Sequence, residues 1–591
     1  MRRDLNQLDN TQYDVLIIGA GAFGACAARD AAMRGLRTAL IERNDFGGAT
    51  SAECFKMVHG GIRYLQHADL KRLRSSCHER SAFLRIAPHL VHPLPIAIPT
   101  YGYGRRGAFF LGTGARLYDA LTYGRNAGIR DPERHIDGTR VLRRDEVLAM
   151  FPEVDDPQLS GAVVFEDGQM HNPARLVLAF VTSAAASGAD VANRVEAVSY
   201  LWKGDTIIGA RVRDTLTGDE FDIRAKLTLN ASGPWADYLC LKDERFRKHQ
   251  RKPFSRDAYF IVDRPPAHDH ALAVQGLSRD KDAILGRSTR HLFMAPWRDK
   301  TLVGVWHRYF DRNPDLAQVG PEEIEQWIAE VNHVHPPLEL QPSEVTFANC
   351  GLVPFGDTAT ESELSFGKES RIIDHRARDG VSGLVTLIGI RYTTARADSR
   401  KALELLLDQS NLATHRPRTE TLPVTGGDIA DFARFSRDAY GVWPAHVSRS
   451  ALAGILRNFG TEHRALLARI HKDPSAATLI PHTTTLLAEV AHAVEHEMAM
   501  RLEDVVLRRT DLAAGCHPGS QALRDAATEM AKRLGWSAQR TADEVAATEQ
   551  VLRNHLAKPA IHSAQRQPAL ETTASPQPPV PAMAILGTHH A

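Results

Sequence analysis

Three glycines near the start of the chain, Gly19, Gly21 and Gly24, have the spacing of a turn that can bind phosphate groups. A short apolar run over residues 13–18 precedes them, and an alanine-rich stretch over residues 22–34 follows. In a strand–turn–helix unit, the first glycine allows a tight turn, the second lets the backbone approach a pyrophosphate, and the third lets the helix pack against the strand. The N–H groups at the helix start then attract the phosphates.

A carboxylate follows the second strand of this unit. Residues 37–42 form another apolar run that ends in Glu42, where a carboxylate can accept hydrogen bonds from a ribose diol. The strands, glycines, helix and carboxylate occur in the expected order. We therefore prefer dinucleotide binding to a glycine-rich turn without a ligand, although the unit alone does not distinguish NAD from FAD.

Two other glycine-containing segments carry residues that could act on a substrate. Residues 56–65 (KMVHGGIRYL) include His59 and Arg63, and residues 389–396 (GIRYTTAR) include Arg391. A guanidinium group can bind phosphate bidentately, and a histidine can act as a base near neutral pH. The structural alternatives are a salt bridge for each arginine and a hydrogen-bonded histidine within the fold.

The composition argues against several classes of protein. Lysine plus arginine (72) balances aspartate plus glutamate (71), so no overall field favours nucleic acid. The six cysteines form no CxxC pair, which argues against a disulfide framework or a cysteine zinc site and fits a reducing compartment; we predict no metal site. No apolar run reaches the ~20 residues that span a bilayer. The polar residues 1–12 do not resemble a secretion signal.

The remaining chain must position these segments, and its 591 residues suggest about three or four domains. β-rich patterns cover residues 190–202, 206–214, 220–230 and 385–390, and helical patterns cover residues 175–187, 321–333 and 394–409. Residues 94–168 look irregular, and residues 432–555 look helical throughout. We predict an α/β protein with a two-dinucleotide-binding, Rossmann-like domain, an interleaved β-rich substrate domain and a C-terminal all-helical domain.

The predicted boundaries alternate between these parts. The dinucleotide-binding domain comprises residues 13–92, 171–250 and 346–416, and the substrate domain comprises residues 93–170 and 251–345. Residues 417–556 form the helical domain. Residues 557–591 are rich in Pro, Ala, Ser, Thr and Gln, which is typical of a disordered tail.

Taken in order, these motifs resemble the FAD-dependent glycerol-3-phosphate dehydrogenase family. The resemblance spans about residues 13–555 and is carried by residues 13–24, 50–51, 56–65, 167, 172–176, 230–235 (NASGPW), 295–297, 389–396 and 495–510. It implies that the first unit holds the ADP half of FAD and that residues 56–65 lie near flavin and substrate. Residues 230–235 would close a second cofactor strand, and residues 389–396 would lie beside the isoalloxazine.

The motifs and the resemblance together give the candidate site residues. The cofactor-binding candidates are Gly19, Gly21, Ala22, Phe23, Gly24, Glu42, Arg43, Thr50, Ser51, His59, Gly60, Gly61, Ala231, Gly233, Trp235, Gly389, Arg391, Tyr392 and Thr393. The substrate-binding candidates are Arg63, Tyr64, Arg391 and Thr394, and the catalytic candidates are His59, Arg63, Arg391, Tyr259 and His307. For Thr393 and Thr394 we also expect roles in backbone geometry and as a helix N-cap.

Four positions depart from the family pattern. Val353 stands where an arginine is expected, and Tyr259 ends Asp257-Ala258-Tyr259, where the pattern has G-S-H with a candidate catalytic histidine. His307 ends Gly304-Val305-Trp306-His307, where the pattern has G-T-T-D, and Arg391 replaces a lysine. All four lie in segments expected on the substrate side, so we predict a retained flavin site beside an altered substrate pocket.

The resemblance implies oxidation of sn-glycerol 3-phosphate to dihydroxyacetone phosphate, with hydride passing to FAD and electrons to quinone. A paralogue that acts on another polyol phosphate or a hydroxy acid is the first alternative, favoured by the departures at Val353, Tyr259 and His307. An oxidase that reduces O₂ is the second. The third belongs to another class, a catalytically silent flavoprotein that serves as a scaffold.

The resemblance also implies a cytoplasmic enzyme bound peripherally to the cytoplasmic face of the inner membrane. Residues 101–125 mix arginines with aromatic and aliphatic side chains, a mixture that suits a membrane interface as well as a basic loop over the substrate domain. Residues 495–510 are expected to pack at a domain junction. The oligomeric state, including a homodimer, and the role of the tail are left open.

Overall fold

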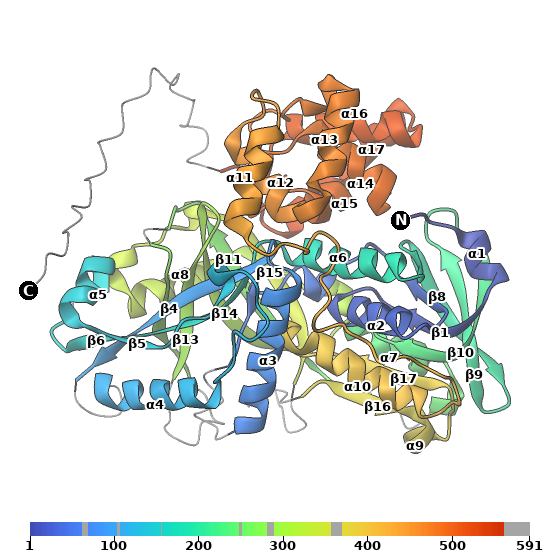
Figure 1. Cartoon of the computed structure of the whole chain (residues 1–591), viewed down its shortest axis with the longest axis horizontal. Coiled ribbons are helices and arrows are strands. Elements are labelled where there is room, and N and C mark those ends of the chain that lie inside the picture. Colours follow the sequence, from blue (N-terminus) through green and yellow to red (C-terminus); the bar gives the residue numbers. More distant parts are fainter. Residues whose placement is uncertain are drawn as a thin grey trace, which may run out of the picture.

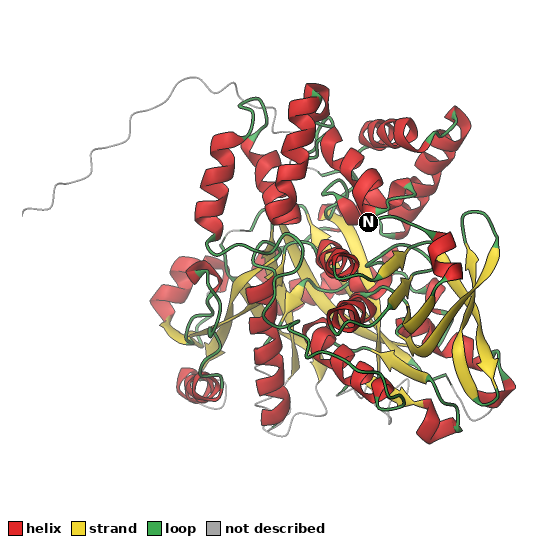
Figure 2. Cartoon of the chain, turned by 45° about the vertical axis from the view of Figure 1, so that its right-hand side comes forward, coloured by secondary structure: helices red, strands yellow, loops and turns green. Residues whose placement is uncertain are grey.

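Two β-sheets lie side by side in the computed structural model, and a helical domain covers one side of both (Figure 1). The structure describes residues 1–61, 69–102, 107–154, 156–246, 251–266, 268–279, 289–355 and 369–560. Figure 2 shows the strands running through the body of the molecule while the C-terminal helices gather at its upper side. Within these ranges no helix is long and apolar enough to cross a membrane.

The first sheet contains the predicted dinucleotide-binding unit. Its central strand β1 (Gln12–Ile18) pairs in parallel with β2 (Thr38–Ile41) and with β10 (Glu220–Asn230). All but the first residue of β1 are buried, as expected for a parallel strand covered on both faces. The strand order in this sheet is β16-β17-β10-β1-β2-β7. The strand β9 also pairs with β10, and β8 pairs with β9. The remaining bounds are β7 Asp190–Ala192, β8 Val195–Lys203, β9 Thr206–Asp214, β16 Arg371–Asp374 and β17 Leu384–Ile388.

Three helices pack against the first sheet, and the first of them also packs against the other two. They are α2 (Ala22–Met33), α6 (Pro173–Ala186) and α10 (Ala395–Leu407). Their alanine, valine and leucine side chains join those of β1, β2 and β10 in one buried apolar cluster. The strands and helices predicted for this half of the molecule are confirmed to within a few residues.

The second sheet has nine strands in the order β15-β11-β14-β13-β12-β4-β6-β3, with β5 paired to β6. It is mostly antiparallel, and α8 (Pro321–Val334) packs against it. The strand bounds are β3 Met57–Val58, β4 Val91–Tyr101, β5 Arg140–Arg143, β6 Leu159–Met170, β11 Phe254–Val262, β12 Ala271–Arg279, β13 Thr289–Trp297, β14 Lys300–Phe310 and β15 Val345–Pro354.

The expectation of irregular structure over residues 94–168 is wrong, because β4 and β6 pair along almost their whole lengths there. Three prolines, Pro93, Pro95 and Pro99, hide the strand pattern of β4, since proline cannot donate a ladder hydrogen bond. The strand tolerates them because its other neighbour, β12, pairs with it only at Ile96 and Ala97.

Two predicted boundaries also need correction. Residues 346–354 belong to the second sheet, because β15 pairs with β11, so the last dinucleotide-binding segment begins after Pro354 rather than at residue 346. The strand β3 lies within residues 13–92 yet pairs with β6 of the second sheet. At the other end, residues 557–560 still contact the fold, because Lys558 N donates to Thr346 O at 3.0 Å. The rest of the predicted tail lies outside the described residues.

The C-terminal domain is helical, as predicted. Residues 495–510 do not form one helix: α14 ends at Glu497, Met498 is left-handed, and a π-helix covers Val505–Arg509. Among the described residues, the α-helices not yet delimited are α1 Leu5–Asn10, α3 Leu70–Ile86, α4 Ala108–Leu121, α5 Arg144–Met150, α7 Ala236–Leu241, α9 His375–Asp379, α11 Phe432–Val442, α12 Arg449–Phe459, α13 His463–Lys472, α14 Leu487–Glu497, α15 Leu502–Asp504, α16 Ser520–Leu534 and α17 Ala538–Asn554.

Candidate active site

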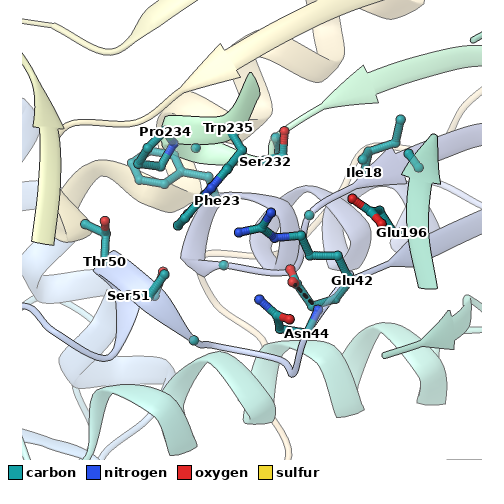
Figure 3. Close-up of a pocket in the computed structure, with 18 of the residues that line it drawn as sticks. Ile18, Phe23, Glu42, Asn44, Thr50, Ser51, Glu196, Ser232, Pro234 and Trp235 are labelled. Carbon is teal, nitrogen blue, oxygen red and sulfur yellow. Dashed lines mark hydrogen bonds between the residues drawn. The ribbon is translucent and has the colours of Figure 1, made fainter. Parts of the chain in front are cut away.

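A cavity of about 530 Å³ opens at the carboxyl ends of β1, β2 and β10 (Figure 3). Phe23, Ser51 and Glu42 line it from the N-terminal unit, and Ser232 and Trp235 line it from the segment after β10. The N-terminus of α2 opens on this cavity, and a helix N-terminus attracts phosphate. The carboxyl edge of a parallel sheet is the usual ligand site of such folds.

The glycine turn has the geometry that its spacing predicts. Gly19 has φ +98°, a value that few other residues adopt. A Cβ on Gly24 would lie 1.8 Å from the carbonyl oxygen of Gly19, so only glycine lets α2 pack this close to the turn. The N–H of Ala22 donates to Ser51 Oγ at 2.9 Å, which joins the start of α2 to the loop after β2.

Glu42 braces the same wall. Its two carboxylate oxygens accept from the N–H groups of Ala20 (2.8 Å) and Asn44 (2.9 Å), and burial raises the pKa of the carboxyl group. Arg43 lies over the Trp235 ring, 4.4 Å from its centroid, and pairs with Asp315. These contacts hold this wall of the cavity in shape, while the expected bond from Glu42 to a ribose stays a prediction.

A second cavity of about 440 Å³ adjoins the first and extends to the second sheet. Both cavities are lined by Ala22, Phe23, Thr50, Ser51 and Gly389. The far wall of the second cavity is lined from the second sheet by Asp257, Tyr259, Arg290, His291, Phe293, His307 and Val353. The two adjoining cavities, with the glycine turn at one end, fit an extended dinucleotide such as FAD.

Most of the predicted residues line one cavity or both. The first is lined by Gly19, Gly21, Ala22, Phe23, Glu42, Arg43, Thr50, Ser51, Ala231, Gly233, Trp235 and Gly389. The second is lined by Ala22, Phe23, Thr50, Ser51, His59, Gly61, Tyr259, His307, Gly389, Arg391, Tyr392 and Thr393. The predictions for Arg63 and Tyr64 fall outside the described residues.

Three predicted residues lie behind the walls. Gly24 packs against the turn, as described above. The N–H of Gly60 donates to Asp167 Oδ1 at 2.5 Å. Thr394 takes the N-cap position of α10, but its hydroxyl donates to Asp398 Oδ2 at 2.7 Å, and it lines neither cavity. Direct substrate binding by Thr394 is therefore not supported by its position.

The two glycine-containing segments meet at the second cavity. The N–H of His59 donates to Thr393 Oγ1 at 3.0 Å, which fixes residues 56–61 against the segment after β17. Arg391 Nη1 donates to Ser76 Oγ on α3 at 3.0 Å, so α3 helps to hold this guanidinium at the cavity wall. A cation and a histidine thus lie at the same wall, as the sequence motifs suggest.

Tyr259 is held inside the wall. Its hydroxyl donates to the carbonyl oxygen of Cys54 at 2.8 Å and accepts from Lys56 Nζ at 2.8 Å. Burial raises the pKa of Tyr259 well above its ordinary value and lowers the pKa of Lys56 to about 8. These contacts fit a structural hydroxyl better than the predicted catalytic one.

His307 faces a carboxylate that the sequence interpretation did not select. Its Nδ1 lies 2.7 Å from Asp257 Oδ1, because β14 and β11 pair with His307 opposite Asp257. The signal was present, since both residues occupy positions that depart from the family pattern. The interpretation also missed Arg290 and His291 on β13, which line the same cavity.

The C-terminal domain also reaches the cofactor side. Glu503 and Arg508 line the first cavity, although about 460 residues separate them from the loop after β2 that lines it too. In the sequence, residues 495–510 stand out only by their resemblance to a family signature. That resemblance did not predict that Glu503 and Arg508 line this cavity.

Comparison with known proteins agrees with this geometry. The family model described as "FAD dependent oxidoreductase" matches residues 14–393, and the one described as "C-terminal domain of alpha-glycerophosphate oxidase" matches residues 417–541. The turn, the sheets and the two cavities therefore define an FAD-dependent oxidoreductase.

Similar proteins place the chain more narrowly. Glycerol-3-phosphate dehydrogenase of Synechocystis sp. is 30% identical over 549 residues, which cover 90% of this chain and 95% of that protein. The human mitochondrial glycerol-3-phosphate dehydrogenase is 32% identical, with 90% of this chain and 72% of that protein covered. The chain belongs to the FAD-dependent glycerol-3-phosphate dehydrogenase family.

A solved structure shares the fold. The glycerol-3-phosphate dehydrogenase from Bacillus halodurans, determined in complex with FAD, superposes with a TM-score of 0.71 at 20% identity. The match covers 93% of this chain and 96% of that chain, so both sheets and the helical domain are included.

Proposed function

We propose that this protein oxidises sn-glycerol 3-phosphate to dihydroxyacetone phosphate and passes the electrons to a quinone. The observation that carries the proposal is the second cavity, in which Arg391, His59 and His307 line the space that adjoins the cofactor cavity. FAD, when bound, supplies the hydride acceptor. The relatives' names support this substrate.

The residues of the second cavity have separate tasks. Arg391 offers charged hydrogen bonds to an anionic group, and a guanidinium suits phosphate oxygens. Arg290 lines the same cavity and supplies a second cation there, although Val353 stands where the family pattern expects an arginine. Phe55, Met57 and Phe293 give the cavity an apolar lining that excludes water from the reacting carbon.

One observation favours a second candidate function. Val353 lines the substrate cavity, so the cation expected at this place is absent from a wall that would contact the substrate. A different polyol phosphate or a hydroxy acid would place its anionic group elsewhere. We keep oxidation of such a compound as the alternative.

Contact with a membrane surface would give access to quinone. Leu117 on α4 and Tyr123 just after it are 53% and 96% exposed, and Leu70 at the start of α3 is also exposed. Figure 1 places α3 and α4 on the side away from the C-terminal helices. Exposed apolar side chains next to arginines suit a bilayer interface.

Turnover assays test the proposal. Holoenzyme is mixed with sn-glycerol 3-phosphate and a water-soluble quinone analogue, and quinone reduction is followed beside oxygen uptake. Quinone reduction that exceeds peroxide formation supports a dehydrogenase. Peroxide as the main product would make the protein an oxidase. Sedimentation with anionic phospholipid vesicles, using the wild type and Leu117→Glu, tests the membrane contact, which should weaken in the variant.

A further inference from the structure

His307 and Asp257 form a pair at the wall of the substrate cavity. His307 Nδ1 lies 2.7 Å from Asp257 Oδ1, and both residues line the second cavity. The Ser255 hydroxyl donates to the same Asp257 oxygen at 2.5 Å, which fixes the carboxylate on β11. The His307 and Asp257 side chains are 20% and 29% exposed, so both are partly buried at the cavity wall.

We propose that His307 is the base that takes the hydroxyl proton of the substrate and that Asp257 is its positioning residue. The inference rests on the proposed oxidation of a secondary alcohol. As the carbonyl forms, the O–H bond breaks and its proton passes to His307 Nε2. The C–H bond of the same carbon breaks, and its two electrons leave with the hydrogen as hydride for the flavin. One alcohol thus loses two electrons and two hydrogens.

The orientation of the imidazole supports this assignment. Because Nδ1 is directed at Asp257, we assign Nε2 as the ring nitrogen that accepts the proton. The carboxylate holds the ring in one orientation and stabilises the imidazolium that forms, as the acidic partner does in other histidine bases. Tyr259 is a weaker candidate, because its hydroxyl already donates to the Cys54 carbonyl inside the wall.

The sequence departures at these strands are complementary. The family pattern ends one strand segment with histidine and the other with aspartate, whereas this chain has Tyr259 and His307 at those places. Asp257 then supplies a carboxylate on β11, opposite the histidine on β14. This chain thus has a carboxylate and an imidazole opposite each other where the family pattern has a glycine and an aspartate.

Other charged and titratable groups face the same space. Arg290 and His291 approach from β13, and His59 and Arg391 approach from the segments on the flavin side. Their charges also affect the ionisation of His307. The test therefore compares the pH profiles of the variants with the profile of the wild type.

The test measures the anaerobic rate of flavin reduction by sn-glycerol 3-phosphate between pH 5.5 and 9 in stopped flow. His307→Gln should lower the rate at neutral pH by about 10²- to 10⁴-fold and abolish its rise with pH. Asp257→Asn should lower the rate less and move the rise to lower pH, because the imidazolium loses its counter-charge. FAD content should stay at the wild-type level in both variants.

His517→Gln is the matched control. His517 Nε2 lies 2.9 Å from Glu549 Oε2, so this pair has the same chemistry, but it lies in the C-terminal domain and lines neither cavity. The control should keep the rate and its pH profile. A His307→Gln variant that is reduced at the wild-type rate with the wild-type pH profile would overturn the proposal.

Failure of the proposed substrate gives a different result. If sn-glycerol 3-phosphate does not reduce the wild-type flavin but another polyol phosphate or hydroxy acid does, the substrate assignment is wrong. The same variants then test the pair with that compound, under the same criteria. If none of these compounds reduces the wild-type flavin, both proposals are overturned.

Discussion

Arg509 of the C-terminal domain donates to both carboxylate oxygens of Asp45, each at 2.7 Å. Asp45 lies on the loop after β2 that lines the cofactor cavity, and Arg508 Nε donates to it as well, at 2.7 Å. The two arginines hold the pKa of Asp45 far below its ordinary value despite complete burial. The helical domain therefore braces a loop that lines the first cavity.

Removing this carboxylate should destabilise the protein. Asp45→Asn removes the carboxylate that the buried Arg508 and Arg509 share, and loss of one partner from a buried ion pair costs up to about 3–5 kcal/mol. Arg508 keeps its ion pairs with Glu503 and Asp504, which reduces the loss. We expect a lower free energy of unfolding in urea and faster loss of FAD during gel filtration. The difference from wild type should shrink as the pH falls below about 4, where the unfolded aspartate becomes protonated and the contribution of the lowered pKa is lost.

Asp222→Asn is the control for this change. Asp222 pairs with the half-exposed Arg211 across two strands of the first sheet, and exposed pairs contribute less than about 1 kcal/mol. Equal losses of stability in the two variants would contradict the bracing role of Asp45.

Because α2 packs closely against the glycine turn, a side chain at Gly24 should impair FAD binding. In Gly24→Ala the new methyl carbon would meet the Gly19 carbonyl oxygen at 1.8 Å, so the turn or the helix must move and the phosphate site is distorted. Purified protein should contain little FAD, measured as the ratio of absorbance at the flavin and protein bands. Gly114→Ala in α4 is the control, because nothing lies within 4 Å of the added carbon. FAD content that is normal in Gly24→Ala would show that the contact is dispensable.

Tyr259 should matter for stability more than for chemistry. Tyr259→Phe removes the acceptor of Lys56 Nζ and the donor to the Cys54 carbonyl, which costs about 1–3 kcal/mol for buried polar groups. The rate of flavin reduction should change little. If Tyr259→Phe retains FAD but is reduced as slowly as His307→Gln, Tyr259 is a catalytic residue.

The buried Glu489 of the helical domain should make the free energy of unfolding depend on pH. Burial raises the pKa of its carboxyl group to about 8, so the folded protein keeps a proton that the unfolded chain loses near pH 4.3. Its contribution to stability is complete below about pH 4 and is lost as the pH rises to about 8. Glu489→Gln should remove this decline in the free energy of unfolding. Glu325→Gln, at an exposed position of α8, should leave the wild-type pH dependence in place.

The glycine turn and the position of Glu42 could be predicted because both depend on the local sequence pattern. The glycine turn and Glu42 lie within one strand–helix–strand unit, where spacing along the chain fixes spacing in space. The prolines of β4 concealed a strand, because proline breaks the pattern from which strands are recognised.

Long-range contacts explain the rest. The distance from His307 to Asp257 depends on the register between β14 and β11, and the approach of Arg508 to the cofactor cavity depends on how the helical domain docks. Neither is encoded in a local spacing. Tyr259 was selected as a replacement for a family histidine, but its depth in the wall and its bond from Lys56 follow only from packing.

The most direct test of the proposed function is anaerobic addition of sn-glycerol 3-phosphate to the purified holoenzyme while the flavin absorbance is recorded. We expect rapid and complete bleaching, which in Arg391→Gln requires a higher substrate concentration because a cation at the cavity wall is lost. A flavin that stays oxidised with sn-glycerol 3-phosphate at every concentration tested would show that the proposed substrate is wrong.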